Sequence, residues 1–118
     1  MVNYHSSLYN ELKTSFPNVE VKYELFVDSS TTLPCITYCG ASNISYLTGD
    51  TLSFSNVSYY VKVWGNSLAE TLPIMEDVDD KMKELGFVRE SYNELSFNTQ
   101  ICLISLYRGI GYEIEMEN

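Results

Sequence analysis

The chain has 118 residues, 16 of them acidic and 7 basic, so its formal net charge is −9 at pH 7. This balance excludes a protein that grips nucleic acid, because neutralising phosphates needs a surplus of Lys and Arg. The hydrophobic content of 45% and the aromatic content of 14% exclude a disordered acidic tail, and the length predicts one domain with its own core.

Neither a secretory signal nor a membrane span is expected. Residues 1–15 contain no basic stretch followed by an apolar run, and the apolar runs elsewhere fall far short of the roughly 20 residues that span a bilayer. We therefore expect a soluble protein made in the cytoplasm. Its three cysteines, Cys35, Cys39 and Cys102, contain no CxxC pair and are expected to be buried free thiols.

The first half of the chain predicts one helix and three strands. Apolar residues recur every four positions over residues 2–16, which indicates an amphipathic helix that ends at Pro17. Residues 19–27 alternate between apolar and charged side chains, as a half-buried strand does. Two more strands are expected over residues 33–39 and 56–64, and the second has the clearest strand pattern in the chain.

A long loop is expected between these two strands, over residues 40–55, with Gly49-Asp50 as its turn. Connections of this length are usually functional or disordered. Its apolar residues are therefore candidates for a subunit interface, and the alternative is that they cover one end of the sheet. These residues are Ile44, Tyr46, Leu47, Leu52 and Phe54.

A second helix is expected to end just before Gly86, with Ser67 and Glu70 as its capping pair. Pro73 predicts either a kink or a later start near Thr71, and we favour the later start. This helix holds the densest charged cluster, and its spacing from two lysines is typical of a solvated helix face, not of a metal site. The cluster comprises Glu76, Asp77, Asp79 and Asp80.

The last quarter predicts a hairpin, with strands over residues 87–92 and 100–107 joined by residues 93–98. The second strand is apolar on both faces, which indicates a central strand. Gly109-Ile110-Gly111 is expected to break it. In the tail that follows, Tyr112, Ile114 and Met116 alternate with Glu113, Glu115 and Glu117. This tail either pairs with the sheet edge of a neighbour or adds a strand to its own sheet.

The order α-β-β-β-α-β-β predicts an α+β fold, with a twisted, mainly antiparallel or mixed sheet and two helices packed on one face. Residues 1–108 are expected to form a single domain and residues 109–118 an acidic C-terminal tail or arm. We expect no enzyme: the chain shows no catalytic, cofactor-binding or metal-ligating constellation at the spacing that such chemistry needs.

The element order resembles the tail-completion, or tail-terminator, proteins of long non-contractile-tailed phages (siphophages) and prophages. The resemblance covers most of residues 1–108 and is carried by Leu33-Pro34, Ile36 and Tyr38, by residues 59–64, and by residues 82–87. The acidic tail departs from the family pattern.

The resemblance implies a structural virion protein that forms a homohexameric ring. Such a ring would cap the tail tube and join it to the head-tail connector or stopper. Its partners would be further copies of itself, the tail-tube protein and the connector, with DNA passing nearby without specific binding and with no membrane. The location implied is the tail or neck of the virion, after assembly in the host cytoplasm.

Three alternatives stay open: an acidic adaptor or inhibitor that binds a basic partner surface, a head-completion or neck ring component, and a small enzyme of unrecognised type.

The net negative charge lies mostly in the second half of the chain, with 3 − 5 = −2 over residues 1–65 and 4 − 11 = −7 over residues 66–118. A negative lumen would repel DNA. We therefore expect the following residues to face a lumen or an outer acidic surface: Glu76, Asp77, Asp79, Asp80, Glu113, Glu115 and Glu117.

Overall fold

The computed structural model describes residues 5–23, 32–48, 52–97 and 99–112. Over these residues the chain forms two helices and one five-stranded mixed sheet, which confirms the predicted α+β class and element order. The helices are α1 (His5–Ser15) and α2 (Leu68–Glu84). The strands are β1 (Glu20–Lys22), β2 (Cys35–Thr48), β3 (Leu52–Gly65), β4 (Val88–Phe97) and β5 (Gln100–Tyr112).

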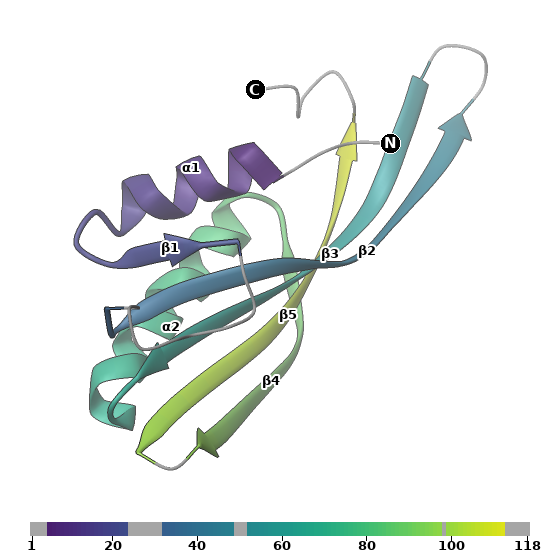
Figure 1. Cartoon of the computed structure of the whole chain (residues 1–118). Helices are drawn as coiled ribbons and strands as arrows, with labels where there is room; N and C mark the ends of the chain where they lie inside the picture. Colours follow the sequence, from purple (N-terminus) through teal and green to yellow (C-terminus); the bar gives the residue numbers. More distant parts are fainter. Residues whose placement is uncertain (1–4, 24–31, 49–51, 98, 113–118) are drawn as a thin grey trace.

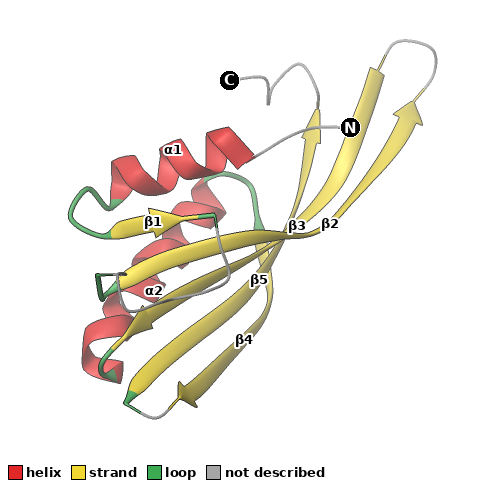
Figure 2. Cartoon of the chain, viewed as in Figure 1, coloured by secondary structure: helices red, strands yellow, loops and turns green. Residues whose placement is uncertain are grey.

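The sheet has the strand order β1-β2-β3-β5-β4. Strand β1 runs parallel to β2, and the other neighbours are antiparallel. Strand β5 lies between β3 and β4, so the prediction of a central strand is confirmed. Both helices lie on the same face of the twisted sheet (Figures 1 and 2).

The core fills the space between the helices and this face of the sheet. Side chains of β3 alternate across the sheet, and the predicted inner set is buried: Val57, Tyr59, Val61 and Val63. On the helix side of the core, α2 contributes a stripe of apolar residues and α1 contributes two leucines. These residues are Met75, Val78, Met82, Leu8 and Leu12. The apolar side chains that recur every 3.6 residues in the helices thus pack against those that recur every 2 residues in the strands, in one apolar layer.

Both ends of α2 are fixed by local hydrogen bonds. The predicted capping pair is confirmed, because Ser67 Oγ accepts from the backbone N–H of Glu70 at 3.1 Å. At the other end Gly86 has a φ of 93°, and the N–H of Phe87 donates to the carbonyl of Met82 at 2.9 Å. This is a Schellman arrangement, and it confirms the prediction that the helix ends just before Gly86. The helix starts at Leu68 with Pro73 inside it, so the later start near Thr71 was wrong.

The strands are longer than their sequence patterns predict. The expected loop over residues 40–55 is instead the paired ends of β2 and β3, in register from Gly40↔Tyr59 to Thr48↔Leu52. A bulge between Gly40 and Ser42 places Ala41 as one extra residue in β2, and the pairing continues beyond it. Likewise Gly109-Ile110-Gly111 does not end β5, because β3 pairs with it as far as Phe54↔Tyr112.

Two other boundaries differ. Strand β4 continues to Phe97, so most of the expected connection over residues 93–98 belongs to the strand, paired with β5. Strand β1 covers only residues 20–22 of the expected 19–27, and residues 24–27 lie outside the described part. Its one buried residue, Val21, packs into the core, as the alternation predicts.

The far end of the sheet projects away from the helices (Figure 1). We call this part the arm and define it as residues 43–48 of β2, 52–57 of β3 and 109–112 of β5, and its first row still contacts the body through Val57 and Gly109. The molecule is correspondingly elongated, with extents of 53 × 25 × 23 Å. The arm lies at one end and the two-layered body at the other.

Candidate functional site

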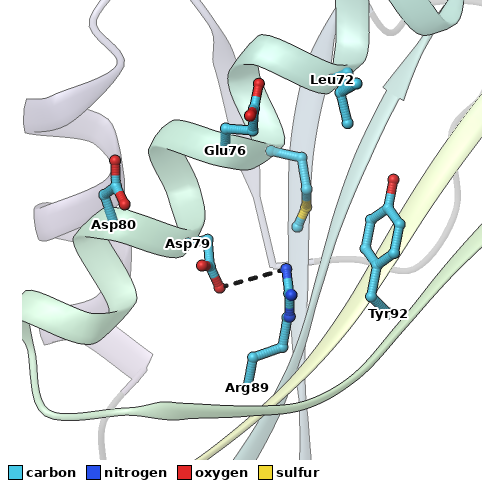
Figure 3. A pocket seen from close by; sticks show the side chains of 7 residues that line it. Leu72, Glu76, Asp79, Asp80, Arg89 and Tyr92 are labelled. Carbon is cyan, nitrogen blue, oxygen red and sulfur yellow. Dashed lines mark ion pairs between the residues drawn. The ribbon is translucent and has the colours of Figure 1, made fainter.

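A pocket of about 350 Å³ lies between α2 and the neighbouring strand β4. Its wall combines apolar, aromatic and charged side chains: Leu72, Met75, Glu76, Asp79, Asp80, Arg89 and Tyr92. Figure 3 shows Asp79 reaching from α2 toward Arg89 of β4. The pocket is therefore the place where the acidic helix meets the charged edge strand.

Asp79 is the centre of a polar network that joins the buried Tyr107 to the exposed side chains of Lys83 and Arg89. Its carboxylate accepts a hydrogen bond from the hydroxyl of Tyr107 at 3.1 Å and pairs with Lys83 at 2.9 Å and Arg89 at 3.7 Å. Burial alone would raise the pKa of Asp79, but the hydrogen bonds from Lys83 and Tyr107 and the charge of Arg89 outweigh it. The pKa consequently lies below its ordinary value, and Asp79 is ionised at neutral pH.

Tyr92, the aromatic residue of the pocket, also makes polar contacts. The Tyr92 hydroxyl donates to the Glu94 carboxylate at 2.7 Å, and the Arg89 guanidinium lies 5.5 Å from the Tyr92 ring centroid. Burial and the neighbouring carboxylate raise the pKa of Tyr92 to about 12. Both contacts lie within β4, and the Arg89–Asp79 ion pair links this side of the pocket to α2.

The acidic candidates separate into two kinds. Glu76, Asp77 and Asp80 are exposed on α2, without an ion pair in the described part of the chain. Asp79 is 9% exposed, so its assignment to an acidic surface was wrong: Tyr107 and Lys83 draw it inward. The three tail candidates, Glu113, Glu115 and Glu117, lie outside the described residues.

The interface candidates gather on the arm. Ile44, Tyr46 and Leu47 belong to β2, Leu52 and Phe54 to β3, and Tyr112 ends β5. Six residues from separate stretches of sequence are thus joined on one ribbon by backbone pairing. Ile114 and Met116 lie outside the described residues.

Both edges of the arm lack a partner strand within the described residues. Strand β1 pairs with β2 only as far as Thr37, and β4 pairs with β5 only as far as Arg108. Beyond these points no described residue pairs with the outer backbone edges of β2 and β5, which span the same rows of the sheet. Such an edge is a template for pairing with another strand.

The edges of the sheet differ in charge. Strand β4 carries Arg89, Glu90 and Glu94 and a bulge between Arg89 and Ser91, both of which discourage edge-to-edge pairing. In contrast, Asp50 is the sole charged residue between Tyr38 and Val61, and residues 109–112 carry no charge. The chain therefore protects the edge of its body and leaves the edges of its arm unprotected.

The cysteines are free, as predicted. Cys35 and Cys102 are fully buried, and burial raises the pKa of their thiols to about 11 and about 12, respectively. Cys39 is partly buried, and burial raises its pKa as well. All three thiols are protonated at neutral pH, so none is an activated nucleophile.

Sequence reasoning missed Arg89, Tyr92 and Tyr107 as parts of the pocket and its network. Tyr107 and Asp79 are 28 positions apart, and no local pattern links them.

The described residues hold no group of three or more His, Cys, Asp or Glu that would bind a metal ion. Within the same residues, no helix is long and apolar enough to cross a membrane. No family model and no curated protein matches the chain.

Proposed function

We propose that the protein is a structural assembly subunit that associates with copies of itself into a closed ring. The observation that carries the proposal is the arm, a three-stranded ribbon with two uncharged edges that pair with no other described strand. A ribbon without a covering helix gains stability when another strand or layer packs against it. Two different edges on one chain favour a head-to-tail interface, and such an interface forms a ring when the rotation between neighbouring copies closes.

The resemblance to siphophage tail-completion proteins suggests where in the virion this ring would lie. The ring would be a hexamer that caps the tail tube and docks on the head-tail connector, with DNA passing through it. The α-β-β-β-α-β-β order on which the resemblance rests is the order of the folded chain. A head-completion or neck ring component is the alternative place for such a ring.

Light scattering coupled to size-exclusion chromatography, followed by negative-stain imaging, tests the proposal. The expected result is a species of several times 13.5 kDa whose images are rings with a central hole. Purified tail tubes from a siphophage whose genome encodes this chain should acquire a cap at one end. A chain that is monomeric at every concentration, both alone and with tubes, would overturn the ring.

A second candidate function is an acidic adaptor that binds a basic partner surface. It is favoured by Glu76, Asp77 and Asp80, three exposed carboxylates on one helix without an ion pair in the described part. Replacing these three residues with Asn or Gln would abolish binding by an adaptor. The same replacement would leave ring formation through the arm intact, so the two functions are separable by one variant.

A further inference from the structure

We infer that the arms themselves form the subunit interface, with the free edge of β2 in one copy pairing with the free edge of β5 in the next. This inference rests on the proposed ring and specifies how the ring is built. Residues 43–46 and 109–112 occupy the same four rows of the sheet, separated only by β3, as in Asn43↔Val57↔Gly109 and Tyr46↔Phe54↔Tyr112. Each copy therefore offers two level edges of equal length.

The strand directions fit a cyclic arrangement. Strands β2 and β5 are both antiparallel to β3, so they run in the same direction. A rotation that carries one copy onto the next would bring β5 of the first beside β2 of the second as a parallel pair. The sheet then continues from one copy to the next, and every copy keeps the same orientation in the ring.

The chemistry of the edges supports a second copy as the occupant. Neither edge carries a charge within these rows, so their approach would bury no unpaired ion even though each copy has a net charge of −9.

The closed arrangement has a defined size. Three strands from each of six copies give 6 × 3 = 18 strands in one barrel. Barrels of about 16–18 strands leave an aqueous channel, which suits the passage of a polymer.

Cysteine cross-linking tests the pairing. In a Cys39→Ser background, Ser45→Cys places a thiol on the β2 edge and Gly111→Cys places one on the β5 edge, both in the row Ser45↔Ser55↔Gly111. Cys35 and Cys102 are buried and stay in place. With a short bismaleimide, which tolerates a small stagger, the double variant should give a covalent ladder that ends at the mass of the ring. Each single variant should give none.

Other outcomes of this experiment would overturn the inference. Covalent dimers from Ser45→Cys alone would mean that two β2 edges meet around a two-fold axis. A ring seen by light scattering whose double variant does not cross-link would mean that the ring is built through another surface, and the proposed function would survive. A monomer without any cross-link would overturn both proposals.

A charge substitution provides an independent readout with a matched control. Ser45→Lys puts a charge on the unprotected β2 edge and should weaken assembly at least about tenfold in the concentration at half-assembly. Asn93→Lys puts the same charge on exposed, already charged β4 and should leave assembly unchanged. Thermal unfolding of both variants establishes that the fold is retained. Equal effects of the two substitutions would overturn the inference.

Discussion

The hydroxyl of Tyr107 donates a 3.1 Å hydrogen bond to Oδ1 of Asp79, and this contact joins the central strand β5 to α2 inside the core. Tyr107 is fully buried, so its hydroxyl has no access to water and depends on this acceptor. Asp79 in turn is held by Lys83 and Arg89. One carboxylate thus ties together α2, β4 and β5.

We expect Asp79→Ala to destabilise the protein by about 2–3 kcal/mol, because it leaves the buried Tyr107 hydroxyl without an acceptor. Tyr107→Phe removes the donor as well as the need for it and should cost about 1 kcal/mol. Urea denaturation followed by circular dichroism measures both. Asp80→Ala, on the exposed face of the same helix, is the control and should change stability by less than about 0.5 kcal/mol. Equal losses for Asp79→Ala and Asp80→Ala would contradict the network.

The same network predicts a pH dependence. Since folding lowers the pKa of Asp79 from its ordinary value of 3.8, its contribution is complete above that value and is lost as the pH falls through the lower folded pKa. The stability gap between the natural chain and Asp79→Asn should therefore be constant at neutral pH and shrink below about pH 4. Unfolding curves of the two proteins at matched pH values measure the gap. A gap that is unchanged at pH 2.5 would show that Asp79 does not titrate as described.

Gly109 is required for packing. A Cβ atom at this position would lie 2.8 Å from Cδ1 of the buried Phe87 ring, which is closer than real Cβ contacts. We expect Gly109→Ala to cost about 1–3 kcal/mol through overpacking. Combining it with Phe87→Leu, which removes the ring, should recover part of that loss in a double-mutant cycle. Additive losses would contradict a direct contact between the two residues.

The thiols should react in two stages. Cys39 is partly buried, whereas Cys35 and Cys102 are fully buried with raised pKa values. In the folded protein at pH 8, we expect an aromatic disulfide reagent to modify one thiol, and all three after unfolding in urea. Cys39→Ser should remove the fast stage. Rapid modification of three thiols in the folded state would mean that the outer face of the sheet opens readily.

The sequence predicted the class and order of elements because periodicity and capping residues are local signals. The alternation at Val57, Val61 and Val63 and the cap at Ser67 and Gly86 each follow from neighbouring residues. These signals decide which segments become helices or strands, and hence the α+β class.

The ends of the strands were not predictable in the same way. Residues 40–48 are rich in Ser, Asn and Gly, and only their pairing with β3 makes them a strand. Gly109 looks like a strand breaker until Phe87, from another part of the chain, is placed against it. The inward turn of Asp79 likewise depends on Tyr107. The strand over residues 40–48, the continuation of β5 through Gly109 and the burial of Asp79 all depend on contacts between residues far apart in the sequence. Such contacts cannot be predicted from local composition.

The elongated shape has a practical consequence in solution. A body with extents of 53 × 25 × 23 Å meets more friction than a sphere of 13.5 kDa, so one copy of this chain will diffuse and sediment slowly for its mass. It will leave a gel-filtration column early, at the position of a larger globular standard. A column calibrated with round proteins would therefore overestimate the mass of a single copy, whereas light scattering measures the mass independently of shape.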